Sequence, residues 1–140
     1  MDLILKPLRH YADFTGRARR KEFWSFFLFV WIMLLVLMYL DTVLGLGGTA
    51  TGYRTGNSIG FNMTGGLLTL LFGLATLIPS LAVSVRRLHD VGKSGWYLLF
   101  IIVLLIGWIY LLYLYVQPGM SGPNEYGPDP KAADAGKVFT

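Results

Sequence analysis

One short stretch of the chain combines residue types that active sites and ligand-binding loops use. The segment "RRLHDVGKSGW", residues 86–96, holds three cations, an aspartate, a serine and one of the two histidines, and it lies between two long apolar runs. Such a segment could form a phosphate-binding loop, a hydrolytic site, a metal site or the turn between two membrane spans. Each alternative requires different neighbours, so the rest of the chain distinguishes between them.

The catalytic and metal-binding alternatives lack the neighbours that they need. A nucleotide-binding loop ending at Ser94 would require a glycine at the position of Arg87 and a preceding strand. His89 and Asp90 are adjacent on a tight turn, so they cannot easily orient one another as a hydrolytic trio requires. With no cysteine, and with His10 as the other histidine, the ligands for a metal are too few. The sequence therefore predicts a protein that is not an enzyme, with no catalytic residue, metal site or cofactor.

Cations gather in this stretch and in a second one near the N-terminus, "GRARRKEFW" at residues 16–24. Glu22 and Asp90 are available to join the two segments by ion pairs, which leaves other cations to meet lipid phosphates. We therefore expect a cluster for ion pairs and anionic headgroups that comprises Arg17, Arg19, Arg20, Glu22, Arg86, Arg87, Asp90 and Lys93. The predicted partners of this surface are the lipid bilayer and its anionic phospholipids, and nucleic acid is not expected.

The composition places the chain in a membrane. Of its 140 residues, 54% are hydrophobic and 14% are charged, and the mean hydropathy is +0.55. Three apolar runs approach the roughly 20 residues that a helix needs to cross about 30 Å of hydrocarbon. The predicted fold is a single all-α integral membrane domain over residues 1–140. It is a small bundle of three transmembrane helices at residues 22–43, 63–86 and 94–116, with a short N-terminal interfacial helix and a Gly/Pro-rich tail over residues 117–140.

The positions of lysine and arginine predict the orientation in the membrane. Six precede the first span and three lie in the turn after the second, whereas residues 41–62 hold only Arg54. The N-terminus and the turn are therefore predicted on the cytoplasmic side. Three spans put the tail outside, whereas a re-entrant third segment that bends back at Gly107 would return it to the cytoplasm. Residues 45–62, "GLGGTATGYRTGNSIGFN", lack apolar periodicity and are predicted to form a flexible external loop.

Small and weakly polar residues follow one side of the second span. Thr69, Gly73, Thr76, Ser80 and Ser84 are spaced by 4, 3, 4 and 4 residues, which gathers them into one narrow stripe along a helix. One interpretation is a packing seam, because small residues let helices approach closely in lipid. The other is the wall of a polar pathway. A homo-oligomer or a membrane-protein partner is expected to cover this face.

Four segments carry a resemblance to a known family: "YADFTGRARRKEFW", "RRLHDVGKSGWYLLF", "LIGWI" and "QPGMSGPNEYGPDP". In order and spacing they resemble the domain-of-unknown-function 805 family, the YhaH-like bacterial inner-membrane proteins, over essentially the whole chain. The resemblance implies a small multi-span protein of the bacterial inner (cytoplasmic) membrane and implies no established activity, substrate or cofactor. Family members carry a proline shortly before the "IGW" element, where this chain has Val103. Any break that the proline marks therefore lacks its local signal here.

Two functional hypotheses remain. The first is an oligomeric membrane protein that binds or passes an ion, a small solute or a lipid, with its cationic cytoplasmic face on anionic headgroups. The second is a scaffold or regulatory subunit of a membrane complex that transports nothing, in which the stripe is a docking seam. Both use the same residues, so the sequence leaves both open.

Overall fold

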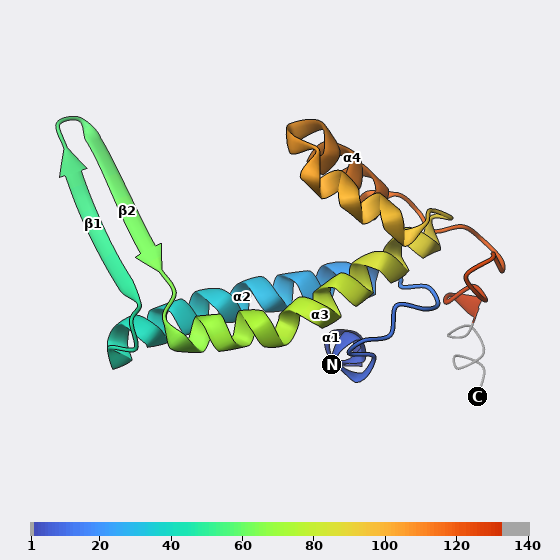
Figure 1. The fold of residues 1–140 in the computed structure, drawn as a ribbon, viewed down its shortest axis with the longest axis horizontal. Coiled ribbons are helices and arrows are strands. Elements are labelled where there is room, and N and C mark those ends of the chain that lie inside the picture. Colours follow the sequence, from blue (N-terminus) through green and yellow to red (C-terminus); the bar gives the residue numbers. More distant parts are fainter. Residues whose placement is uncertain (1, 133–140) are drawn as a thin grey trace. The chain divides into compact units, whose positions relative to one another are not determined.

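The computed structural model describes residues 2–132, whose elements follow the order α1, α2, β1, β2, α3, η1, α4 (Figure 1). The chain forms two compact units: Phe27–Ile78, and Met1–Phe26 together with Pro79–Thr140. Because α2 and α3 each run through the boundary, every unit contains part of both helices. The two units are described in turn below.

Two long helices contain most of the apolar sequence. α2 covers Arg20–Leu44 and α3 covers Leu67–Asp90, and both are long and apolar enough to cross a membrane, with mean hydropathies of 2.4 and 2.1. Their leucines are largely uncovered by the rest of the chain, since Leu35, Leu70 and Leu74 are 53%, 58% and 59% exposed. A helix that is apolar all round belongs in a protein core or in lipid, and these two are not in a core.

The residues between α2 and α3 form a β-hairpin. β1, Thr49–Thr55, pairs antiparallel with β2, Ser58–Thr64, around a two-residue turn. Gly56 begins the turn with φ of 59°, a left-handed conformation that glycine adopts without steric cost. Tyr53 pairs with Gly60, and its ring occupies the space that a side chain at Gly60 would need. The prediction of a flexible loop over residues 45–62 is therefore wrong, and the all-α fold is not confirmed.

Asp41 links the end of α2 to the start of α3. Its fully buried carboxylate accepts hydrogen bonds from the backbone N–H groups of Gly66, Leu68 and Thr69, each at 2.9 Å, and from Thr69 Oγ1 at 2.7 Å. The first N–H groups of a helix have no partner within that helix. Asp41 therefore caps α3 from a neighbouring helix, which explains an acidic residue at the end of an apolar span.

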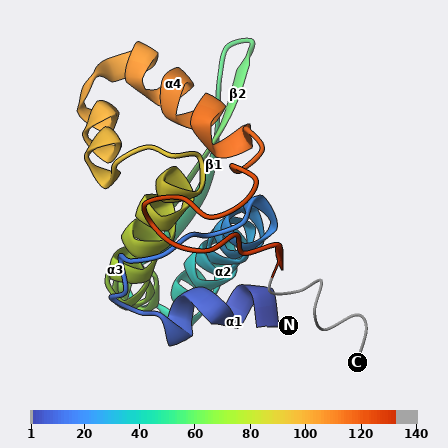
Figure 2. The same ribbon diagram turned by 90° about the vertical axis from the view of Figure 1, so that its right-hand side faces the viewer.

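In the other unit, the third apolar segment consists of two short helices. η1 is a 3₁₀ helix over Gly95–Ile102, and α4 covers Leu104–Val116, with Val103 between them in an extended conformation. Along a continuous helix Tyr97 and Tyr110 would lie about 20 Å apart, yet their ring centroids are 6.3 Å apart. The chain therefore folds back so that α4 lies against η1 (Figures 1 and 2). The structure differs here from the predicted continuous helix over residues 94–116.

The end of α4 in this helical hairpin, η1 with α4, lies beside the N-terminal segment. The rings of Phe23 and Tyr115 are 4.4 Å apart, and Arg20 Nη1 donates to the carbonyl of Val116 at 3.1 Å. The tail continues alongside, where Arg17 Nη1 donates to the carbonyl of Gly122 at 2.6 Å. These contacts place the tail beside the N-terminal segment, and the side of the membrane on which the tail lies stays a prediction.

A short helix, α1, covers Asp2–Arg9 at the N-terminus, with Pro7 buried near its end (Figure 2). A helix is what the apolar spacing of this segment predicts, and its place at the membrane interface stays a prediction.

The segment after α1 carries Asp13, which accepts from Thr15 Oγ1 at 2.5 Å. This hydrogen bond, the largest cause, holds the pKa of Asp13 below its usual value.

Replacement of Asp41 by Ala should destabilise the protein. The substitution removes the acceptor of three partly buried N–H groups at the start of α3, and each donor left without a partner away from water costs about 1–3 kcal/mol. Thermal unfolding in detergent, followed by circular dichroism, should show a clearly lowered midpoint. Asp13→Ala is the matched control, because that side chain is 41% exposed. Equal midpoints for the two variants would contradict the capping role.

Candidate functional site

A buried carboxylate between two guanidinium groups lies at the end of α3. Asp90 Oδ1 accepts from Arg17 Nε at 3.0 Å, and Asp90 Oδ2 accepts from Arg87 Nη1 at 2.6 Å. All three side chains are buried, with Arg87 completely so. Charge-assisted hydrogen bonds of this kind are the strong ones, and they are needed here because removing charges from water is costly.

Both arginines also bind carbonyl groups around the end of α4. Arg17 donates to the carbonyls of Met120 and Gly122, and Arg87 donates to those of Tyr115 and Gln117. These bonds satisfy guanidinium hydrogens that the carboxylate does not reach. The tail is fixed further because Met120 N donates to the carbonyl of Asp90 at 2.8 Å.

Gly119 brings the tail close to Asp90. A Cβ atom on Gly119 would collide with the Asp90 carboxylate, so a glycine is needed for this approach. The ion-pair cluster is therefore enclosed by three segments: the N-terminal segment, the end of α3 and the "QPGMSGPNEYGPDP" segment of the tail.

A second buried carboxylate, Glu22, lies in the first turn of α2. Its Oε2 atom accepts from Lys6 Nζ at 3.0 Å, and its Oε1 atom lies 3.6 Å from Arg86 Nη1. The two cationic stretches are also joined through the backbone, because Ala18 N donates to the carbonyl of Arg86 at 3.0 Å. Glu22 thus pairs with Arg86 and Asp90 pairs with Arg17, so each carboxylate binds a cation of the other stretch.

His89 and Ser94 were candidates for a hydrolytic site or a nucleotide-binding loop in the sequence, and both make structural contacts. The His89 ring stacks on Tyr126 with centroids 3.9 Å apart, and its Nδ1 atom lies 3.2 Å from the carbonyl oxygen of Gly16. Ser94 Oγ accepts from Trp96 N at the start of η1. Lys93 lies over the ring of Tyr97, with its Nζ atom 5.5 Å from the ring centroid.

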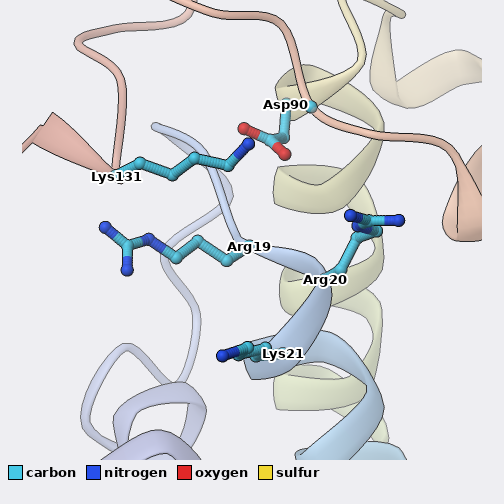
Figure 3. A pocket seen from close by; sticks show the side chains of 6 residues that line it. Arg19, Arg20, Lys21, Asp90 and Lys131 are labelled. Atoms are coloured by element: carbon cyan, nitrogen blue, oxygen red, sulfur yellow. The ribbon is translucent and has the colours of Figure 1, made fainter.

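A pocket of 240 Å³ opens beside the Asp90 cluster and is lined mainly by cations. Arg19 lies just before α2, Arg20 and Lys21 are its first residues, Lys131 comes from the tail, and Asp90 and Gly119 complete the lining (Figure 3). We call this the cationic pocket. Arg20 and Lys21 are exposed, as is Lys131, whereas Arg19 is half-buried.

Seven of the eight residues of the predicted cluster divide into two groups, and the eighth, Lys93, belongs to neither. Arg17, Glu22, Arg86, Arg87 and Asp90 are buried and hold the segments together. Arg19 and Arg20 line the pocket. Lys21 and Lys131 were missed by the sequence prediction. Lys21 adjoins the predicted residues, but nothing local marks Lys131, because its position depends on how the tail folds back.

Asp129 orders the part of the tail that carries Lys131. Its carboxylate accepts from Lys131 N at 2.9 Å and from Gly122 N at 3.1 Å. The backbone hydrogen bond from Lys131 is the largest cause of a pKa below the usual value for Asp129. Because this pKa is depressed in the folded chain, the turn gains stability above the usual aspartate pKa and loses it as the pH falls through the folded value.

The predicted stripe lies on the more covered side of α3. Thr76 is buried, and Thr69, Gly73, Ser80 and Ser84 are half-buried, whereas the neighbouring leucines are exposed. The hydroxyls of Thr76 and Ser84 donate to carbonyls of their own helix, four residues earlier. Among residues 2–132, and apart from the adjoining residues and the backbone of α3 itself, no atom lies within 4 Å of the position that a Cβ atom at Gly73 would take. Space for a neighbouring backbone therefore exists at this point.

Within residues 2–132 no group of three or more His, Asp and Glu side chains is placed to hold a metal ion. The chemistry available in the cationic pocket is instead that of anion binding. Guanidinium and ammonium groups donate charge-assisted hydrogen bonds to phosphate oxygens, guanidinium often in a bidentate way.

The comparison with known proteins agrees with a membrane location. The family model "Protein of unknown function (DUF805)" matches residues 11–128. The chain belongs to the DUF805 family. The matched residues include the whole Asp90 cluster, whereas Lys6 and Lys131 lie outside them.

Two relatives of this chain are named as inner membrane proteins. Inner membrane protein YhaH of Escherichia coli strain K12 is 40% identical over 131 residues, which cover 94% of this chain and 98% of that protein. Inner membrane protein YhaI of the same strain is 39% identical over 131 residues, covering 94% of this chain and 97% of that protein. No solved structure matches this chain. Together with the two long apolar helices, these relatives identify an integral membrane protein.

Substitution of Asp90 by Asn should be severely destabilising. It preserves the shape of the side chain but leaves Arg17 and Arg87 buried without a counter-charge, and removing one member of a buried pair costs about 3–5 kcal/mol. Unfolding in detergent should begin at a much lower temperature, and trypsin should cleave the tail at Lys131 sooner. Asp13→Asn makes the same change of charge at a half-exposed site and should behave like the wild type. Wild-type stability in Asp90→Asn would show that the cluster is not what holds the tail.

Proposed function

We propose that this DUF805 protein binds anionic phospholipids of the inner membrane through the cationic pocket. The observation that supports this best is the lining itself, in which Arg19, Arg20, Lys21 and Lys131 surround a single carboxylate. Cations clustered next to a membrane span are the usual recognition surface for acidic headgroups, and each contributes about 1 kcal/mol near an anionic surface.

The carboxylate in the pocket does not cancel this charge. Asp90 already accepts from two buried guanidinium groups, those of Arg17 and Arg87. Its negative charge is therefore already paired with Arg17 and Arg87, so Asp90 is not reserved as the counter-ion of the cations that line the pocket. A lipid phosphate is an anion of suitable chemistry, and at headgroup level it is present at high local concentration.

The position of the pocket along the chain fits this ligand. It is built from the first residues of α2 and the last residue of α3, the ends of the two helices that are long enough to span the membrane. By the distribution of lysine and arginine we place these ends on the cytoplasmic side and the β-hairpin outside. The cytoplasmic leaflet is also the one whose surface carries negative potential.

The stripe on α3 supports a second proposal, that copies of the chain associate in the membrane. Gly73 has open space beside it, and it lies between residues that are half-buried in one chain. A helix from another copy can approach closely at such a point, because no side chain keeps the backbones apart. In a non-transporting scaffold, a different membrane protein would bind the same face of α3. In a pathway, that face would be in contact with water.

Removal of two pocket cations should weaken binding of anionic lipid. Lys21→Gln with Lys131→Gln takes two exposed charges from the pocket without touching the buried pairs. At about 1 kcal/mol per cation, the affinity should fall roughly 30-fold. Native mass spectrometry of the purified protein with added phosphatidylglycerol measures the bound fraction, and phosphatidylcholine gives the background.

The control for this experiment is Arg54→Gln with Lys93→Gln, which changes the net charge equally. Arg54 lies on β1 and Lys93 lies outside the pocket lining. Equal loss of phosphatidylglycerol in both double variants would mean that total charge, and not the pocket, determines the binding.

Gly73→Leu should reduce self-association. The larger side chain fills the space through which another backbone approaches, so the oligomer should dissociate or its melting temperature should fall. Leu74→Ile is the control, because Leu74 is exposed and lies beside the stripe. Size-exclusion chromatography with light scattering in detergent gives the assembly size. An unchanged size and melting temperature in Gly73→Leu would exclude a packed interface and favour the pathway.

A further inference from the structure

The hairpin of η1 and α4 has an exposed apolar surface that neither the cationic pocket nor the family assignment explains. Residues 94–116 contain no charged side chain. At the bend Ile102, Leu105 and Ile106 are 74%, 76% and 78% exposed. A continuous apolar surface of this kind on a chain that also spans the membrane must meet lipid or another protein.

We propose that the hairpin is re-entrant: it enters the membrane from the side of the cationic pocket, occupies that one leaflet, and is surrounded there by acyl chains. The chain then crosses the membrane twice, by α2 and α3, and the tail returns to the side of the N-terminus. The proposal does not rest on headgroup binding in the pocket.

The two ends of the hairpin provide the first argument. Four residues separate its first residue from the end of α3, and its last residues contact the start of α2 through the Phe23–Tyr115 rings and the Arg20–Val116 hydrogen bond. Arg87, in the last turn of α3, also donates to the carbonyl of Gln117. Entry and exit are therefore at one level, beside the cationic pocket.

The lengths of the two limbs provide the second argument. The 8 residues of η1 extend about 16 Å and the 13 residues of α4 about 20 Å. The hydrocarbon layer is about 30 Å thick, so each limb is too short to cross it but long enough for one leaflet of about 15 Å.

Two backbone hydrogen bonds order the bend. Val103 N donates to the carbonyl of Phe100 at 3.0 Å, and Gly107 N donates to the carbonyl of Val103 at 2.9 Å. These two bonds hold Val103 between the limbs, whereas the start of α4 has no side-chain cap. Gly107 also lets α4 approach η1, since a Cβ atom there would collide with the Phe100 carbonyl oxygen.

The distribution of side chains indicates acyl chains as the surroundings rather than a protein partner. Ile102, Leu105 and Ile106 at the bend are aliphatic, whereas the base carries Trp96 and Tyr113, both exposed; Trp108, also exposed, lies between these two levels. Aromatic residues with a polar group prefer the level of the headgroups, and aliphatic residues prefer the hydrocarbon. The same order from base to bend is expected for a segment that descends from the surface into one leaflet.

Single cysteines in this cysteine-free chain test the proposal in native membranes. Asn57→Cys reports on the β-hairpin turn, Ala12→Cys on the N-terminal segment, Ser121→Cys on the tail and Leu105→Cys on the bend. With a membrane-impermeant maleimide, Asn57→Cys should label from outside, and Ala12→Cys and Ser121→Cys from the cytoplasmic side. Leu105→Cys should label from neither side until the membrane is dissolved.

The depth of the bend gives a second readout in proteoliposomes. A bimane on Leu105→Cys should be quenched most by lipids brominated within the leaflet on the side of Ser121→Cys. Labelling of Ser121→Cys together with Asn57→Cys would overturn the proposal in favour of a third span. Labelling of Leu105→Cys by the impermeant reagent would place the hairpin in water, and a disulfide between two copies of Leu105→Cys would show that protein covers it. Lys21→Gln with Lys131→Gln should leave the labelling pattern unchanged, which separates this test from that of the pocket.

Discussion

The unit formed by Met1–Phe26 and Pro79–Thr140 depends on one buried carboxylate between two guanidinium groups. Burying Asp90, Arg17 and Arg87 costs several kcal/mol per ion, and good geometry with further hydrogen bonds is needed to offset that cost. The carbonyls at the end of α4 and in the tail supply those bonds. As a result the N-terminal segment, the end of α3 and the tail can only be buried together, because each satisfies charges that the others bring.

The same arrangement explains why a strongly cationic stretch does not act as one surface. Arg86 and Arg87 are adjacent in sequence, yet both are buried and face carboxylates, as Arg17 does. The charge that remains accessible belongs to the residues around them, of which Lys21 and Lys131 are exposed. The buried pairs therefore fix the positions of the segments, and these positions bring cations from two distant parts of the chain to one pocket. Charge density along the sequence alone does not separate the two roles.

The sequence predicted the elements whose formation depends on composition alone. Hydropathy located α2 and α3 to within a few residues, because lipid requires a long apolar helix whatever its neighbours are. The fold-back of η1 and α4 depends on contacts such as that of Tyr97 with Tyr110. The sequence around Val103 contains no local pattern that predicts them. The β-hairpin did have a signal in Gly56 and Asn57 between two runs of β-branched and aromatic residues. High glycine content concealed it, since glycine indicates flexibility and tight turns equally.

The contact between Arg17 and the tail has a consequence for the order in which the protein is made. Arg17 and Gly122 are 105 residues apart, so the acceptor is synthesised after both long helices and the segment that follows them. Folding of this unit must therefore wait until Gly122 has left the ribosome, and it must close a very long loop. During that interval Arg17, Arg86 and Arg87 remain hydrated, and in the predicted orientation they count among the positive charges that keep the N-terminus inside during insertion. The arginines are thus hydrated charges first and the charged interior of a folded unit later.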